Sequence, residues 1–440
     1  MRENLDFRLV RSSGRSDLQI FVYKDGVYSL CAAETFKGII KQFIADYDES
    51  LITMFVVNEV YNQLMTDLNF CNIEDLNTDE SIINFENGLL KVTADEKTLM
   101  PHSPDVLSTI QIPCKWNETE VPTPIFDSYM KTLTKGNKQI ENLLLQFIGV
   151  AISNVKGFRM KKSLFMVGPG DTGKSQLKSL CEKLVGPENF SSCDFNDLEE
   201  RFGTSDLYGK RLAGSADASH MSVKELKTFK KLTGGDSIHA EFKGQKAFDF
   251  TFNGLLWLCM NSLPKFGGDN GPWVYERIMV VVCDNVIPKD KQDKSLLDKM
   301  YTEREGIIQK AVSALQQVIK NEYRYDEPEC VAQERENYRL ENSTVSMFFE
   351  DCMCKRPNGQ ITDNCTTSRV YKVYQSWCRN NNHGYFETAR DFRNGISKLI
   401  GGEFKDVTTK RSGYSYYTDY TLTMDTKQEY ASVYGYDNVS

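Results

Sequence analysis

Eight consecutive residues carry the clearest chemistry in the chain, because they fit the pattern GxxxxGK[ST]: Gly168, Pro169, Gly170, Asp171, Thr172, Gly173, Lys174 and Ser175. Glycines allow backbone N–H groups to curl around phosphate oxygens, and the helix that opens here presents its positive N-terminal end. In such a P-loop the lysine ammonium lies between the β- and γ-phosphates, and the serine hydroxyl is a ligand of Mg²⁺. The spacing therefore predicts a site for ATP and Mg²⁺.

Two later apolar runs end in polar residues that suit the same site. The run 211–216 ends at Asp217, which we expect to hold Mg²⁺ together with Ser175; a helix N-cap is the alternative. The run 255–260 ends at Asn261, which could orient the attacking water and sense the γ-phosphate, or simply close a turn.

Two further elements carry cations whose role the pattern leaves open. Arg277 precedes the apolar run 278–283 and could reach a neighbouring subunit's phosphate as an arginine finger, or solvate a strand edge. His239, Phe242 and Lys243 lie at an expected hairpin tip, which could insert into a channel and grip a phosphodiester backbone, or be a solvated turn.

The elements around these residues alternate between strands and helices. We expect a strand over 163–167, a helix through Leu184, and strands over 211–216, 255–260 and 278–283, which together indicate an α/β fold with a parallel sheet. A helix is expected over 303–320, followed by a charged, proline-containing linker.

The flanking regions have patterns of their own. Asp25-Gly26 and Asn87-Gly88 lie between β-prone runs and predict hairpins, whereas apolar spacing predicts helices from Pro124 to about Ser153. Near the C-terminus, two amphipathic helices precede a hairpin, which is the order of a winged helix. The expected domains are an N-terminal α/β domain (1–122), a helical connector (123–155), an ATPase core (156–325), a linker (326–342), a winged-helix-like domain (343–425) and a tail (426–440).

Composition narrows the class of protein. Hydrophobic residues make up 40% and charged residues 26% of the 440, which is typical of globular chains. The net charge of −8 means that any contact with nucleic acid must use a local basic surface or a channel. We find no apolar run long enough to span a membrane and no signal-peptide core, and the twelve cysteines occur singly. We therefore expect a cytoplasmic protein with reduced thiols and no membrane partner, in the host-cell cytoplasm if a phage encodes it.

The motifs taken together resemble the superfamily 3 helicases, specifically the phage/plasmid and poxvirus-type primase–helicase group. The segments that carry the resemblance follow the P-loop in the order GKRLAGSADAS, ELKTFKKLTGGDSIHAEFKGQ, FDFTFNGLLWLCMNSLPKF and WVYERI. INFENGLLKV and LLLQFIGVAIS are similar to the N-terminal domain and connecting helix of that group. No primase domain is evident ahead of the motor.

The resemblance implies an AAA+-like motor that forms a hexamer, moves 3′-to-5′ along single-stranded DNA and unwinds duplex for the replication of a phage or mobile element. It gives Lys174, Asp217, Asn261 and Arg277 the catalytic roles, with Arg277 acting on the neighbouring subunit. Lys243, with Phe242 or His239, becomes the residue that grips DNA. The implied partners are single-stranded and forked DNA, further copies of the chain, and a separate primase or polymerase.

One departure from the pattern leaves two other functions open. Asp217 has no adjacent glutamate to activate water, and Glu225 is the only substitute we find. The alternatives are a ring ATPase that remodels an origin or loads a replisome without processive unwinding, and a degenerate ring that only binds DNA or a partner.

Overall fold

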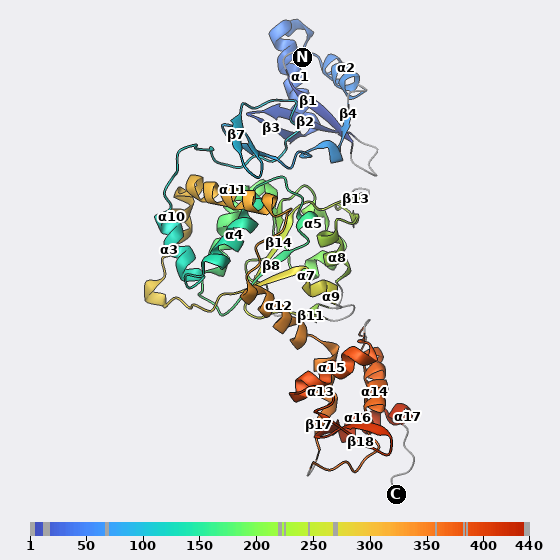
Figure 1. Ribbon diagram of the computed structural model, residues 1–440. Coiled ribbons are helices and arrows are strands. Elements are labelled where there is room, and N and C mark those ends of the chain that lie inside the picture. Colours follow the sequence, from blue (N-terminus) through green and yellow to red (C-terminus); the bar gives the residue numbers. More distant parts are fainter. Residues whose placement is uncertain are drawn as a thin grey trace. The chain divides into compact units, whose positions relative to one another are not determined.

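The computed structural model describes residues 5–11, 18–66, 70–218, 222–223, 226–244, 247–266, 272–356, 359–381, 383 and 386–434. The chain forms two compact units (Figure 1). The first unit comprises residues 1–219, 228–262 and 279–331, and the second comprises 220–227, 263–278 and 332–440. None of the helices in the described ranges has the length and apolarity needed to cross a membrane.

The N-terminal part of the first unit contains two small sheets and a pair of helices. Its elements are β1 (Phe7–Arg11), β2 (Leu18–Lys24), β3 (Val27–Cys31), α1 (Ala33–Tyr47), η1 (Glu49–Leu51), α2 (Met54–Met65), β4 (Phe70–Asn72), η2 (Ile73–Asp75), β5 (Ile82–Phe85), β6 (Gly88–Val92) and β7 (Lys97–Met100). The strands pair in the orders β3-β2-β1-β4 and β5-β6-β7. Both expected hairpins are present, since β2 pairs with β3 and β5 with β6 in antiparallel register. Leu9 and Ile20 of the first sheet share a core with Phe36 of α1 and Val57 of α2.

The rest of the first unit is built around a five-stranded sheet with the order β16-β8-β14-β10-β9. Its main elements are α3 (Pro124–Leu133), α4 (Lys138–Ala151), α5 (Gly157–Met160), β8 (Ser163–Val167), α6 (Lys174–Val185), η3 (Pro187–Asn189), β9 (Phe190–Ser191), α7 (Phe195–Glu199), η4 (Ser205–Leu207), β10 (Leu212–Ala213), α8 (Lys227–Gly234), β12 (Ile238–Ala240), β13 (Phe248–Phe250), β14 (Leu255–Met260), β16 (Ile278–Val282), η5 (Lys289–Lys291), α10 (Leu296–Thr302) and α11 (Arg304–Lys320). Parallel pairs join β8 to β14, β14 to β10, and β10 to β9. The α/β class with a parallel sheet is therefore confirmed.

Helices cover both faces of this sheet. Leu164 and Met166 of β8 belong to the large core that α4, α6 and α11 complete. Phe165, between them in sequence, points to the other face, where its ring lies 5.8 Å from that of Phe195 in α7. Phe195 in turn contacts Phe229 of α8 at 5.5 Å between ring centroids. The alternation of strand side chains thus fills two separate layers.

Two expectations about local structure need correction. The strand expected over 211–216 is only Leu212–Ala213, because Gly214 adopts a φ of +134° and interrupts it. The stretch expected to be a linker (326–342) is largely helical, because it contains α12 (Glu329–Glu341). Pro328 lies directly before this helix, where a proline is tolerated, and buried Tyr338 anchors its second half.

The second unit consists of α12 from Ala332 on, the short segments 220–227 and 263–278, and the C-terminal domain. The short segments contain β11 (Ser222–Val223), β15 (Lys265–Phe266) and α9 (Pro272–Tyr275). The rings of Phe266 and Tyr275 lie 5.5 Å and 5.4 Å from that of Tyr338, whose hydroxyl donates to the Pro264 carbonyl at 2.6 Å. These contacts fix the segment that ends at Arg277.

The C-terminal domain contains the expected two helices and hairpin, within a longer order of elements. These are α13 (Thr344–Cys352), β17 (Met353–Lys355), α14 (Thr367–Asn380), α15 (Ala389–Ile400), β18 (Thr408–Arg411), β19 (Tyr414–Tyr417), β20 (Tyr420–Leu422), α16 (Met424–Glu429) and α17 (Ala431–Tyr434). β18 pairs with β19, and β17 pairs with β20 across the domain. Phe348, Tyr374 and Phe392 form the aromatic centre of its core.

A buried ion-pair cluster lies in this domain. The Asp363 carboxylate accepts from Arg356 at 2.7 Å and from Lys427 at 2.6 Å, and the Thr421 hydroxyl also donates to it at 2.6 Å. Burial by itself raises the pKa of Asp363, but the hydrogen bonds from Lys427, Thr421 and Arg356 outweigh it and hold this pKa well below its usual range. Because the pKa of Asp363 is lower in the folded chain than in the unfolded chain, the cluster stabilises the domain fully above the unfolded pKa of about 4. This stabilisation is lost as the pH falls from there toward the folded pKa.

Asp363→Asn is expected to destabilise the C-terminal domain by about 3–5 kcal/mol at pH 7, since it leaves two buried cations without their counter-charge. Urea unfolding of the full chain, followed by hydrogen exchange of α14 and β17, measures this loss. Asp406→Asn, at an exposed carboxylate of the same domain, is the matched control. Equal protection of α14 in the wild-type and Asp363→Asn proteins at pH 7 would contradict the prediction.

Candidate functional site

A cavity of about 1050 Å³ opens at the carboxyl ends of β8, β10 and β14. Residues 170–176 form one wall, Asp217 and Asn261 lie beside them, and residues of α3 and of the segment 285–296 complete the lining. Open parallel sheets bind ligands at this edge, outside the carboxyl ends of their strands. The structure therefore brings together three motifs that are distant in the sequence.

The glycine-rich loop (168–175) is held in its curved conformation by close backbone contacts. Gly168 has a φ of +151°, and a methyl group on it would lie 1.9 Å from the Cys283 carbonyl oxygen. Gly173 has a φ of +92° and immediately precedes α6. The Asp171 carbonyl accepts from the Ile287 N–H at 2.8 Å, which ties the loop to the opposite wall. Residues with a Cβ would not fit Gly168 without movement of the sheet.

Lys174 is buried at the first position of α6, and its ammonium group folds back onto the loop. It donates to the carbonyls of Gly168 at 2.7 Å and Pro169 at 2.6 Å, and to the Thr172 hydroxyl at 3.2 Å. All three acceptors are neutral, and burial lowers the pKa of this lysine. A buried cation at a helix N-terminus, bonded only to neutral oxygens, is a binding point for an anion.

Ser175 and Asp217 are adjacent across the cavity floor. The Ser175 hydroxyl donates to the Ala216 carbonyl at 2.7 Å. β10 pairs with β14 at Ala213 and Leu256, and a second bridge joins Ala218 to Met260. The segment after β10 therefore has one more residue between the two pairings than β14 has. Such a bulge re-aims a side chain. Here the bulge leaves Asp217 exposed in the cavity rather than within the sheet.

The oxygen donors at this point suit a magnesium ion. A serine hydroxyl and one carboxylate are hard ligands, and Mg²⁺ is commonly held by one or two carboxylates together with substrate phosphates. Across the described ranges, no group of three or more His, Cys, Asp or Glu side chains is placed to hold a metal ion by itself. Phosphate oxygens would therefore have to complete the coordination.

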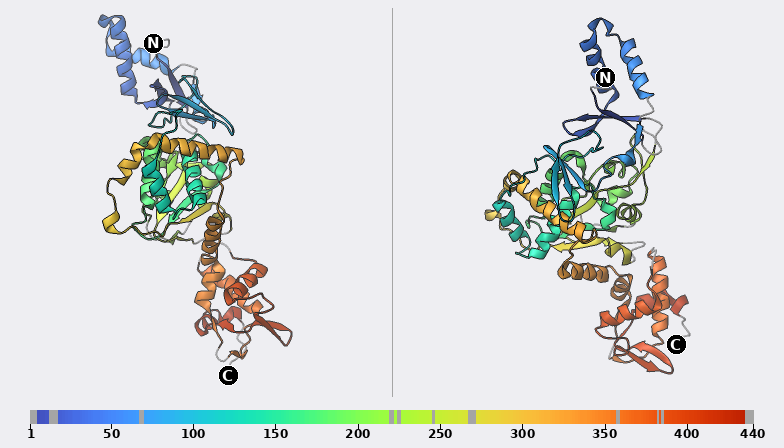
Figure 2. Two further views of the ribbon diagram at one scale, coloured as in Figure 1. Left: turned by 60° about the vertical axis from the view of Figure 1, so that its left-hand side comes forward. Right: turned by 45° about the horizontal axis from the view of Figure 1, so that its top comes forward.

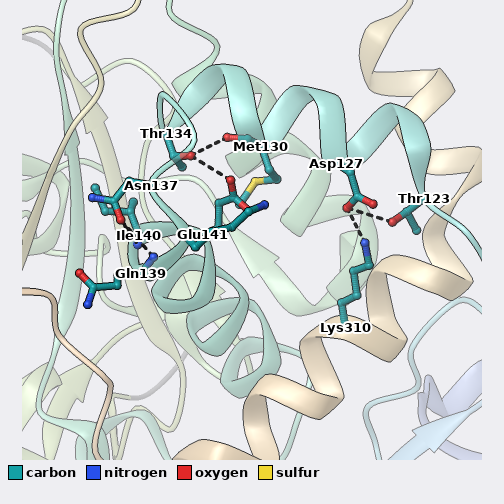
Figure 3. Close-up of polar contacts among 10 residues, drawn as sticks. Thr123, Asp127, Met130, Thr134, Asn137, Gln139, Ile140, Glu141 and Lys310 are labelled. Carbon is teal, nitrogen blue, oxygen red and sulfur yellow. Dashed lines mark hydrogen bonds and ion pairs between the residues drawn. The ribbon is translucent and has the colours of Figure 1, made fainter.

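Helix α3 supports the glycine-rich loop from the side. The Tyr129 hydroxyl donates to the Gly173 carbonyl at 2.8 Å, and burial raises the pKa of this tyrosine. Figure 3 shows how the helix itself is held: Asp127 accepts from Thr123 and forms an ion pair with Lys310 of α11. The Thr134 hydroxyl donates to the Met130 carbonyl at 2.8 Å and closes the same helix. The connector is thus part of the cavity wall.

The three residues expected to grip DNA lie on the β12–β13 hairpin, outside the cavity lining. The Phe242 ring stacks on Phe248 with centroids 5.3 Å apart, so it packs within the hairpin. The His239 ring nitrogen Nδ1 lies 3.0 Å from an Asp249 carboxylate oxygen on the facing strand. Lys243 is exposed beside Gly244 at the tip. This arrangement leaves Lys243 as the residue of the three best placed to reach a ligand.

Arg277 lies in the second unit, directly after α9. Its N–H donates to the Val274 carbonyl at 3.1 Å, and its guanidinium lies 5.6 Å from the Trp273 ring centroid. Its role as a finger stays a prediction. Glu225, the substitute base, lies outside the described residues.

Tyr129 and the segment 285–296 were not predicted as parts of the site. The helical spacing over 124–153 predicts an apolar face but does not say which residue meets the loop. The only available signal for Tyr129 is that a buried tyrosine hydroxyl usually has a hydrogen-bond partner. The segment 285–296 carries no motif of its own.

Three families match successive parts of the chain. Residues 16–135 match the family described as D5 N terminal like, residues 166–277 match a family of unknown function (DUF5906), and residues 340–431 match the family described as Poxvirus D5 protein-like. The two D5 matches flank the cavity-bearing region in the order that the motifs predict. The N-terminal and C-terminal regions of the chain therefore both match D5-like families, which confirms the resemblance to the poxvirus-type primase–helicase group seen in the sequence.

Solved structures of one other protein are similar to this chain. One, described as the A form apo structure of the NrS-1 C terminal region, is 11% identical, and the match covers 95% of this chain and 96% of that chain with a TM-score of 0.47. A second apo structure of the same region is 11% identical over 94% of this chain and 96% of that chain, with a TM-score of 0.44.

Proposed function

We propose that this chain is an ATP-dependent DNA helicase that acts in the replication of a phage or other mobile element. It would assemble as a ring, a hexamer by family resemblance, and move 3′-to-5′ along single-stranded DNA. The matches to D5-like families support the replication context. The AAA+-like P-loop reading of the core and the winged-helix reading of the C-terminal domain belong to the same proposal.

The observation that carries the proposal is the buried Lys174 ammonium at the N-terminus of α6, bonded to three neutral oxygens. A triphosphate would replace these acceptors with charged ones, and the N–H groups of the loop would point at its oxygens. Ser175 and Asp217 would hold Mg²⁺, which would neutralise charge on the β- and γ-phosphates.

Asn261 and Asp217 would then act on the water molecule that attacks the γ-phosphate. β14, which Asn261 directly follows, lies between β8 and β10, so the amide would lie between the glycine-rich loop and the acid. From that position it can orient a water molecule in line with the γ-phosphate. Asp171, Asp217 and Asp293 all line the cavity, but Asp217 is the one that follows β10, the strand next to β14, and it can accept a proton from that water or hold the metal.

Hydrolysis that depends on DNA tests this proposal directly. Phosphate release by the full chain with ATP and Mg²⁺ is expected to rise several-fold when single-stranded DNA is added, because DNA in the pore selects the hydrolysing arrangement of the ring. Duplex of the same length, without tails, is the control. Turnover that single-stranded DNA does not change would contradict a motor driven on DNA, and no turnover at all would favour a ring that only binds.

Lys243→Ala is expected to separate hydrolysis from unwinding. Because Lys243 lies at the exposed hairpin tip, outside the cavity lining, ATP turnover should stay within about twofold of wild type while strand displacement falls at least about tenfold. Displacement of a tailed duplex and phosphate release, measured in one reaction, give both values. Lys320→Ala, at an exposed lysine of α11, should change neither. Normal strand displacement by the Lys243→Ala protein would show that the hairpin tip is a solvated turn and does not grip DNA.

Arg277→Ala is expected to abolish turnover but preserve nucleotide binding, since a finger completes the site of the neighbouring subunit. Mixing provides the decisive test. Equal amounts of Arg277→Ala and Lys174→Ala proteins should regain turnover, because about a quarter of the interfaces in mixed rings pair an intact lysine with an intact arginine. If Arg277 served its own subunit, no site would contain both residues and mixing would restore nothing.

A further inference from the structure

The connection between α1 and α2 exposes an unusual set of large apolar side chains. Tyr47 is 86% exposed, Met54 67%, Phe55 78% and Leu51 44%. We call residues 47–55 the α1–α2 tip; it lies at the end of the helix pair that points away from the strands (Figures 1 and 2). Contiguous exposed apolar residues of this size are typical of interaction surfaces.

The tip is held in shape without its apolar side chains. The Ser50 N–H and hydroxyl both donate to the Asp48 carboxylate, at 2.9 Å and 2.6 Å. The Thr53 hydroxyl accepts from the Val56 N–H at 3.2 Å and caps α2. The domain core forms below it, around Phe36 and Val57. The exposed side chains are therefore presented on an ordered turn and are not needed for packing.

The surroundings of the tip are strongly acidic. Asp46, Asp48 and Glu49 are exposed among the apolar residues. The segment 42–66, which contains the tip and α2, has four aspartates and glutamates and no lysine or arginine, and Lys41 of α1 is the nearest cation before it in the sequence. Such a surface repels the phosphate backbone of a nucleic acid and attracts a cationic polypeptide.

We propose that the α1–α2 tip is a docking site for a protein partner that presents a short basic, amphipathic helix. The apolar face of that helix would cover Tyr47, Met54 and Phe55, and its lysines or arginines would lie opposite Asp46 and Glu49. Aromatic and methionine side chains at the centre with charges at the rim are the usual anatomy of such contacts. This site is separate from the nucleotide cavity and does not depend on the proposed motor activity.

A designed peptide tests the chemistry of the site with the full chain. The probe is a fluorescein-labelled 18-residue helix of leucine and lysine, with a leucine and glutamate peptide of the same pattern as its counterpart. Fluorescence anisotropy should detect binding of the lysine peptide only. Two double variants, Met54→Ser with Phe55→Ser and Asp46→Lys with Glu49→Lys, should each weaken it at least about tenfold. Tyr414→Ser with Met424→Ser, at exposed apolar residues of the C-terminal domain, should stay within about twofold.

Three results would overturn the proposal. If either tip variant bound the lysine peptide with unchanged affinity, the peptide would bind at another acidic surface of the chain. A smaller assembly of the Met54→Ser, Phe55→Ser protein in sedimentation velocity would make a second copy the occupant. Weaker binding of single-stranded DNA by the Asp46→Lys, Glu49→Lys protein would make the tip part of a nucleic-acid path. The charge variant leaves the apolar residues in place, so it tests the site independently of any effect of the serine substitutions on folding.

Discussion

Lys174→Ala is expected to reduce ATP hydrolysis by at least about 100-fold while the protein stays folded. The ammonium group contacts only oxygens of its own loop, at 2.6–3.2 Å, and the cavity beside it can supply water to those oxygens once the lysine is removed. What the variant loses is the only cation of the glycine-rich loop, which would counter the charge that develops on the γ-phosphate.

Phosphate release, with thermal unfolding in parallel, measures both halves of this prediction. Lys183→Ala removes a partly exposed lysine of the same helix, whose ammonium pairs with Asp298 at 2.8 Å, and should leave turnover unchanged. Binding of a fluorescent ATP analogue should also weaken in Lys174→Ala, because the cation contacts the nucleotide before hydrolysis. If the Lys174→Ala protein hydrolysed ATP within twofold of the wild-type rate, the glycine-rich loop would have no part in hydrolysis.

Arg211→Met is expected to destabilise the first unit by about 3–5 kcal/mol, a loss as large as that expected for Asp363→Asn in the C-terminal domain. The guanidinium is buried and donates to three backbone carbonyls: Asn253 at 2.5 Å, Val150 at 2.9 Å and Val155 at 2.8 Å. Val150 is in the last turn of α4, where a cation also meets the negative end of the helix dipole. Burial lowers the pKa of Arg211 to about 10, so the side chain is still charged at neutral pH.

Urea unfolding of the full chain tests this role. Methionine fills much of the space but donates no hydrogen bond, so three backbone carbonyls lose a charged donor at once. The carbonyls of Asn253 and Val150 still accept from the N–H groups of Gly157 and Ser153, whereas that of Val155 loses the guanidinium. Lys210→Met, one residue away, removes a single exposed hydrogen bond to the Glu188 carbonyl and should cost less than about 1 kcal/mol. An Arg211→Met protein as stable as wild type would show that water replaces the guanidinium at this point.

Strong local signals made much of the core predictable. The strands at 163–167 and 255–260 have the expected bounds, because each is a continuous apolar run bordered by polar or glycine residues. The glycine-rich loop, Asp217 and Asn261 meet at one cavity, as expected of residues that follow parallel strands. In these segments the local sequence and the tertiary fold favour the same structure.

The parts that were not predicted depend on contacts between distant segments. The bulge that turns Asp217 toward the cavity depends on how β10 pairs with β14, and Gly214 alone does not specify it. Tyr129 reaches the loop only because α3 forms part of the cavity wall beside it. The charged stretch after 321 contains a helix that is held by Tyr338. The ring of Tyr338 packs against those of Phe266 and Tyr275, which lie more than sixty residues earlier in the sequence. Sequence periodicity reports which face is apolar but not what covers it.

Strand displacement with defined tails tests the proposed motor most directly. Duplexes with a 3′ tail and with a 5′ tail, otherwise identical, are incubated with the full chain, ATP and Mg²⁺, and Lys174→Ala serves as the inactive control. We predict displacement of the 3′-tailed substrate alone, and none by the variant. Displacement of the 5′-tailed substrate would contradict the polarity. ATP consumption without displacement of either strand would contradict the helicase itself and favour a ring ATPase that remodels or loads.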